Sequence, residues 1–278
     1  MKAVLSVALD LFREASSRRW FLALGLAITL LLALAGLTLR IDVVDGALAA
    51  TRLFGKVVHA DIRSVDVALR PVFRAAAYVI FYGGLAFGVI ACADFAPSLL
   101  APGRIEHLLA LPVQRWQLLA GTFFGVLALS LIGALYGAGG FTLLLAVKTG
   151  VWTLRPLLAA LIASVTFAAI YGGMLVAALF ARSAALSAAT GGFLFLAGIV
   201  AGYRQRLDHF FEPGIGRWLF QGATLLLPRV STLADASADL AASAPVDLGA
   251  LGSELVGLAV FGLAALAFGI WRFESQDF

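Results

Sequence analysis

The sequence predicts an all-α polytopic membrane protein with six transmembrane helices, and composition and charge distribution are the observations that predict it. Apolar residues make up 62% of the 278 residues and charged residues only 13%, whereas soluble domains carry about 45–50% and about 25%. The charges lie between six uncharged apolar runs, each about as long as the ~18 residues that cross ~30 Å of hydrocarbon. No fixed-period repeat or low-complexity linker divides the chain, and we therefore expect one transmembrane domain over 1–278.

The amino-terminal segment 3–17 predicts an amphipathic helix that lies on the membrane surface. Its apolar side chains recur at helical spacing, opposite serine and charged residues: Leu5, Leu9, Phe12 and Ala15. Such a pattern is typical of interfacial helices. The first span, 20–39, follows directly after Arg18 and Arg19. A signal peptide cleaved near Ala33-Leu34-Ala35 is the competing interpretation, but the long apolar run and the amphipathic leader favour a span.

The second span is expected over 75–92, between two polar segments. The stretch 40–74 mixes six basic with four acidic residues and predicts an aqueous loop. The single cysteine, Cys92, excludes an internal disulfide framework and should lie near the end of the span as a small apolar residue. After Asp94 the chain carries prolines, a glycine and charges that cannot remain in hydrocarbon. This polar interruption predicts a structured connecting loop with a short helix.

The remaining spans are expected over 118–147, 156–181, 184–202 and 255–270. The third has 30 residues without a formal charge, which is about 45 Å of helix and exceeds the hydrocarbon thickness. It must tilt, kink or protrude. Only Arg182 and Ser183 separate the fourth span from the fifth, and this spacing predicts a tight helical hairpin. Between 203 and 253 an apolar run too short to cross predicts a re-entrant or interfacial segment before the last helix.

The chain lacks the motifs of a self-contained enzyme. It has no HExxH pair, no GxSxG turn and no GxxxxGK[ST] phosphate loop. Its three histidines lie in three separate polar segments, and we expect no metal site, catalytic residue or cofactor in this chain. The net charge of +4 is scattered between apolar runs, which favours contact with anionic lipid headgroups over binding of nucleic acid. A membrane-embedded enzyme remains a third interpretation.

The spans carry uncharged polar residues and glycines but no clearly internal ionisable residue, which argues against a proton-driven mechanism. The polar candidates for lining a pathway, which could equally make hydrogen bonds between helices, are Tyr82, Ser130, Tyr136, Thr142, Thr166 and Tyr171. Four glycine pairs at i, i+4 spacing predict close packing of helices, within one chain in preference to a dimer. They are Gly84 with Gly88, Gly121 with Gly125, Gly133 with Gly137, and Gly198 with Gly202.

The polar segment between the second and third spans has the pattern of a docking helix. Apolar residues fall at helical spacing at Ile105, Leu108, Leu109 and Pro112. Polar residues surround them at Arg104, Glu106, His107 and Arg115. A short helix with an apolar face and a charged rim suits a groove on a partner protein. The alternative is a helix that rests on lipid headgroups.

The order of elements resembles the permease subunits of bacterial ATP-binding cassette transporters, specifically the type-2, exporter-like family. Three features carry the resemblance: Arg18-Arg19-Trp20 at the first span, the sequence GRIEHLLALPVQRWQLL over 103–119, and the tail Arg272-Phe273. The order of elements is similar over the whole chain, whereas close similarity of sequence is limited to about 17 residues.

The resemblance implies a permease that moves an unidentified substrate across the inner membrane. It implies a separate cassette ATPase as partner, which binds ATP and magnesium, and a second permease copy. The even number of spans puts both termini on the same side, and the basic residues before the first span favour the cytoplasm. The runner-up function is a membrane anchor or scaffold for a cassette ATPase that does no transport.

Overall fold

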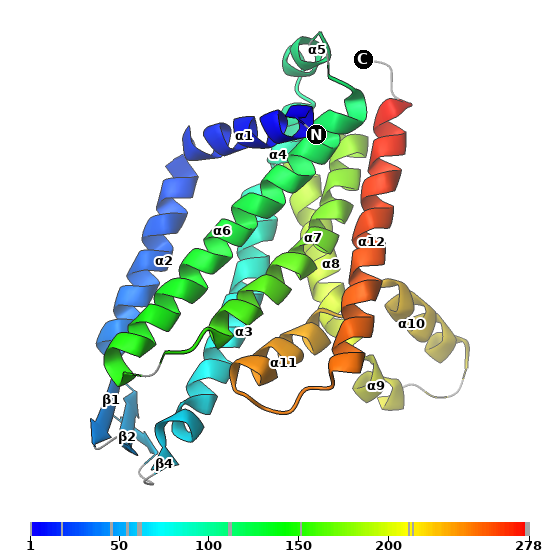
Figure 1. Cartoon of the computed structure of the whole chain (residues 1–278). Helices are drawn as coiled ribbons and strands as arrows, with labels where there is room; N and C mark the ends of the chain where they lie inside the picture. The colour runs from blue at the N-terminus through cyan, green and yellow to red at the C-terminus, as the bar shows by residue number, and fades with distance from the viewer. Residues whose placement is uncertain are drawn as a thin grey trace.

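A computed structural model of the chain describes residues 2–17, 19–44, 47–53, 56–59, 63–110, 113–150, 152–210, 212 and 214–275. Figure 1 shows a helical bundle with both chain ends at one end of it and a small group of strands at the other. Within the described residues, six helices are long and apolar enough to cross a membrane. The prediction of an all-α, multi-pass membrane protein is therefore confirmed for the spanning part.

The six spanning helices are α2 (Arg19–Thr38), α3 (Val65–Cys92), α6 (Arg115–Thr149), α7 (Arg155–Ala181), α8 (Ala184–Gly202) and α12 (Leu248–Glu274). The first predicted span overruns α2 by one residue, and the other five lie inside one helix each. The 35 residues of α6 are about 52 Å long. As expected for that length, α6 crosses the bundle obliquely (Figure 1).

The segment predicted as an aqueous loop over 40–74 is only partly a loop. It contains a small antiparallel sheet of β1 (Leu39–Val44), β2 (Ala47–Leu53), β3 (Lys56–His59) and β4 (Arg63–Ser64), in which β2 pairs with each of the others. Helix α3 then begins at Val65, before the predicted span. The prediction of a loop was wrong for these residues. Charged residues mark where the hydrocarbon ends, but they do not show whether the chain beyond that point is irregular or forms strands and helices.

Helix α1 (Lys2–Ser17) lies across the end of the bundle near α5 (Figure 1). Its buried face comprises Ala8, Leu11 and Ala15 and packs on α6, whereas Leu5 and Leu9 are exposed. The predicted apolar face was therefore too broad: part of it contacts protein and part faces outward. An interfacial position predicts this division, since such a helix meets both the bundle and the headgroup region.

Glycines on α6 make room for α1. A Cβ atom on Gly121 would lie 2.6 Å from Cβ of Val7, and one on Gly125 would lie 3.1 Å from Cα of Ala8. These distances are shorter than ordinary van der Waals contact, so a larger residue at either position would push α1 away. For this pair the prediction of packing within one chain is confirmed.

Helix α7 is the centre of the bundle and contacts α3, α6, α8, α11 and α12. Small residues bring α12 close to it, since a Cβ on Gly172 would lie 3.2 Å from the carbonyl oxygen of Gly262. The hairpin between α7 and α8 turns at Arg182, whose φ of 48° ends α7, and at Ser183, whose hydroxyl oxygen accepts a hydrogen bond from the Leu186 amide. The predicted tight hairpin is thus confirmed.

The segment between α8 and α12 contains α9 (Arg204–Leu207), the 3-10 helix η1 (Asp208–Phe210), α10 (Ile215–Leu226) and α11 (Val230–Ala241). The 12 residues of α10 or α11 make about 18 Å of helix, which is too short to span. Helix α11 is buried against α3, α7 and α8. In contrast, α10 exposes Trp218. Arg217 of α10 donates a hydrogen bond to the Asp208 carboxylate of η1, and this bond lowers the pKa of that carboxyl group.

Candidate functional site

The predicted docking segment lies at the end of the bundle that also holds both chain ends (Figure 1). After α3 ends at Cys92, which is buried and lies at the end of a spanning helix as predicted, the chain forms α4 (Phe95–Leu99) and α5 (Arg104–Leu109) before α6 begins. Gly103 makes the turn into α5 with a φ of 81°, a conformation that glycine adopts without strain. The α4–α5 segment therefore connects two spanning helices through a sharp, defined turn.

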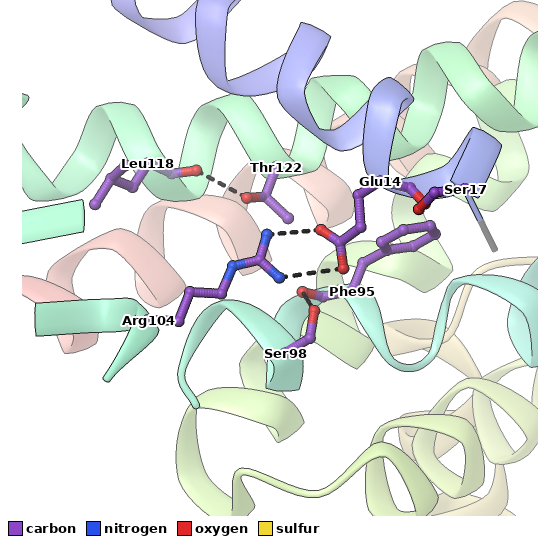
Figure 2. Close-up of polar contacts among 7 residues, drawn as sticks. All are labelled: Glu14, Ser17, Phe95, Ser98, Arg104, Leu118 and Thr122. Carbon is purple, nitrogen blue, oxygen red and sulfur yellow. Dashed lines mark hydrogen bonds and ion pairs between the residues drawn. The ribbon is translucent and has the colours of Figure 1, made fainter. Parts of the chain in front are cut away.

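A two-point ion pair fastens this segment to α1 (Figure 2). The Arg104 guanidinium donates to both carboxylate oxygens of Glu14, at 3.1 and 2.6 Å. The side chains are 36% and 20% exposed, respectively. Paired N–H to carboxylate bonds of this kind fix orientation as well as adding energy. The nearby hydroxyls of Ser98 and Thr122 donate to carbonyls of their own segments, and none of these bonds competes for the ion pair.

The apolar face of α5 turns toward its own chain. Ile105 is 3% exposed and belongs to the main hydrophobic core, and Leu108 packs against the same core. Glu106 is exposed. This arrangement means that Ile105 holds α5 in place from inside, so that a partner would meet the outer, polar side of the helix.

The other predicted docking residues are placed less completely. Arg115, at the start of α6, donates to the backbone oxygen of Glu274 at 3.4 Å and so links α6 to the end of α12. The side chains of His107 and Leu109, and all of Pro112, lie outside the described residues. Their docking role stays a prediction.

The six polar residues predicted to line a pathway have different surroundings. Thr142 and Thr166 are buried and donate to carbonyls one turn back in their own helices. Tyr136 shares a 2.8 Å hydrogen bond with Thr29 and links α6 to α2. Tyr82 packs among aromatic rings of α3 and α8.

The remaining two residues of the six, Tyr171 and Ser130, have different surroundings. Tyr171 is fully buried between Phe123 and Phe167, and its hydroxyl has no hydrogen-bond partner in the described part of the chain. Ser130 lines an elongated apolar groove between α2, α3, α6 and α7. Of the six residues, Ser130 alone is among the described residues that line this groove. A polar pathway inside a single copy therefore stays a prediction.

Sequence reasoning missed a polar cluster at the end of the bundle opposite α5. The Tyr78 hydroxyl donates to Asp235 at 2.6 Å, and Arg74 pairs with Asp239 at 3.1 Å, so that α3 is joined to α11. The signal was available, because residues 74 and 78 on α3 and residues 235 and 239 on α11 each lie one helical turn apart. The sequence does not show that these two turns pair with each other, because Tyr78 and Asp235 are 157 residues apart.

A scan against protein-family models and a search of curated proteins both found no match for this chain.

Proposed function

We propose that this chain is the membrane-spanning permease subunit of an ATP-binding cassette transporter of a bacterial inner membrane. In this function it moves a substrate with energy from ATP that a separate cassette ATPase hydrolyses. The observation that carries the proposal is the construction of α5: a short helix between two spanning helices, seated by Ile105 and tied to α1 by the Arg104–Glu14 ion pair. The resemblance of residues 103–119 to the coupling segment of such permeases supports it.

The mechanical argument follows from what α5 is attached to. It follows α3 through α4 and leads into α6, and α1 packs along α6. A force applied to the outer side of α5 therefore reaches α3 through α4 and reaches α1 through the ion pair. It reaches α6 through the connecting chain and through α1. Because packed cores respond as discrete units and do not deform continuously, movement of an ATPase at this end would shift α3 and α6 as rods. A second permease copy would complete the assembly across the membrane.

The first test concerns the partner. The chain should be purified alone and together with any cassette ATPase that a neighbouring coding sequence specifies. We expect no ATP hydrolysis by this chain alone, because its sequence has no phosphate-binding loop. We expect the two chains to co-purify and the complex to hydrolyse ATP. Hydrolysis by the permease chain itself, or failure of the ATPase to associate, would contradict the proposal.

Orientation can be tested with two exposed serines at opposite ends of the bundle. Ser243 precedes α12, and Ser275 follows it. In a Cys92→Ala background, we expect an impermeant thiol reagent added to intact spheroplasts to label Ser243→Cys and to spare Ser275→Cys. Permeabilised cells should label both, which controls for reactivity. The reverse pattern would place α5 outside the cell, where ATP is not available, and would exclude the proposed coupling.

A further inference from the structure

Helix α10 carries an apolar face that the described part of the chain leaves uncovered. Ile215 is 80% exposed, Trp218 73%, Leu219 57% and Leu225 66%. Their spacing places them on one side of the helix. Exposure alone does not identify what covers such a face. The level of α10 relative to the spanning helices and its rotation about its own axis do.

The level of α10 is set by contacts of the chain that follows it. Helix α8 has 19 residues, which is ~29 Å and close to the ~30 Å of hydrocarbon, so that Gly202 at its end lies at one boundary of the bilayer core. A Cβ on Gly198 would lie 2.7 Å from the carbonyl oxygen of Pro228, and one on Gly202 would lie 2.9 Å from the Thr232 nitrogen. Pro228 is two residues beyond the end of α10, a reach of ~7 Å at most. That end of α10 is therefore held at the boundary between hydrocarbon and headgroups.

The rotation of α10 is set by its polar residues. Arg217 and Gln221, one turn apart on the helix, both donate hydrogen bonds of 2.9 Å to Oδ1 of Asp208. Asp208 follows α9, whose two arginines require water or headgroups around them, and it therefore lies on the aqueous side of the boundary. At about 100° per residue, Ile215 and Leu219 are ~160° from Arg217 around the helix axis. The apolar face thus turns away from water and toward the hydrocarbon.

The residues at the edge of this face fit the same position. Trp218 lies on its flank, and tryptophan is enriched where hydrocarbon meets headgroups. Arg206 of α9 is exposed, and its guanidinium lies 5.4 Å from the centre of the Tyr203 ring. An arginine at this level attracts lipid phosphates. In Figure 1, α10 projects from the side of the bundle toward the end opposite α5, so that lipid can reach its apolar face.

We propose that α10 is an interfacial lipid-binding helix, whose apolar face inserts at the boundary of headgroups and acyl chains in the leaflet at the end of the bundle opposite α5. A re-entrant segment was the other interpretation of the sequence. That position would carry Arg217 and Asp208 into hydrocarbon, where charged side chains are costly even when paired. The inference goes beyond the proposed function, because it depends neither on an ATPase nor on which side of the membrane this leaflet faces.

Collision rates of spin labels test the surroundings of each face of α10. The full chain, with Cys92→Ala, is reconstituted in phosphatidylcholine vesicles, and a nitroxide is attached at Leu219→Cys or at Gln221→Cys. Gln221 is exposed on the opposite face, and the bonds from Arg217 keep α10 on Asp208 in that variant. We expect the ratio of collisions with oxygen to collisions with a polar nickel chelate to be about fivefold higher at residue 219, because hydrocarbon holds no water and excludes the chelate.

Each other outcome overturns the proposal. Equal ratios at residues 219 and 221 mean that the apolar face lies in water. Low collision rates with both reagents at residue 219 mean that protein covers the face, and dipolar broadening between labels then identifies that protein as a second copy. If Leu219→Cys does not fold, Ile215→Cys replaces it, since Ile215 is 80% exposed on the same face.

Discussion

Replacing Glu14 with glutamine should weaken the association of this chain with the cassette ATPase that we propose as its partner by about tenfold, which corresponds to ~1.4 kcal/mol. The Arg104 guanidinium would lose its charged acceptor, and hydrogen bonds to charged groups contribute ~1.5–3 kcal/mol. Because Arg104 is 36% exposed, solvent compensates for part of that loss and the lower part of the range applies. The glutamine amide oxygen can still accept one hydrogen bond, but the paired, charged contact that fixes the orientation of α5 against α1 would be lost. Titration of the purified ATPase against the reconstituted variant measures the effect.

The control lies one residue earlier on the same helix. Arg13 is exposed, and Arg13→Gln should leave ATPase association within about twofold. Exchange of the pair, as Glu14→Arg with Arg104→Glu, should restore a large part of the loss, because the same two side chains can meet in reverse. If Glu14→Gln and Arg13→Gln weaken association equally, the ion pair has no coupling role.

Gly198→Leu should destabilise the bundle by about 1–3 kcal/mol, the usual cost of overpacking. Any Cβ at Gly198 would lie 2.7 Å from the carbonyl oxygen of Pro228, a backbone atom that cannot rotate away. The substitution must therefore push α11 from α8 and strain the hydrogen bond from Ser231 to the Ile199 carbonyl. Thermal unfolding in detergent, followed by a thiol-reactive dye at the buried Cys92, would report the change.

The same substitution at Gly192 is the matched control. Gly192 lies on the same helix, and a Cβ there meets no atom within 4 Å. Gly192→Leu should therefore match or slightly exceed the wild-type melting temperature, because leucine also has the higher helix propensity. Equal destabilisation by both variants would mean that glycine is required for the backbone of α8 and not for its contact with α11.

The spans could be predicted because the thickness of the bilayer determines the length of the charge-free apolar runs. The edges of the helices could not, since Arg70 and Arg74 mark where hydrocarbon ends and α3 continues past them. The strands around Arg40 were missed for a related reason. Their pairing is set by registers such as Arg40 with Arg52. Apolar and polar residues alternate in β1 from Leu39 to Val43, but they do not alternate in β2 or β3 of the same sheet.

The candidate site was predictable in its location but not in its contacts. The apolar spacing of Ile105 and Leu108 correctly indicated a short helix with one apolar face. The same pattern fits a face that packs on its own chain and one that packs on a partner, and the structure places Ile105 in the core. The ion-pair partner of Arg104 lies 90 residues away in sequence, so that only the folded arrangement brings Glu14 beside it.

The most direct measurement is site-specific photo-crosslinking from the outer side of α5. A photoreactive amino acid replaces the exposed Glu106 in cells that co-express the cassette ATPase, and a second variant carries it at the exposed Ser243, at the opposite end of the bundle. The account predicts an adduct of this chain with the ATPase from position 106 and none from position 243. An ATPase that co-purifies with the chain yet gives no adduct from position 106, or an adduct from position 243, would contradict it.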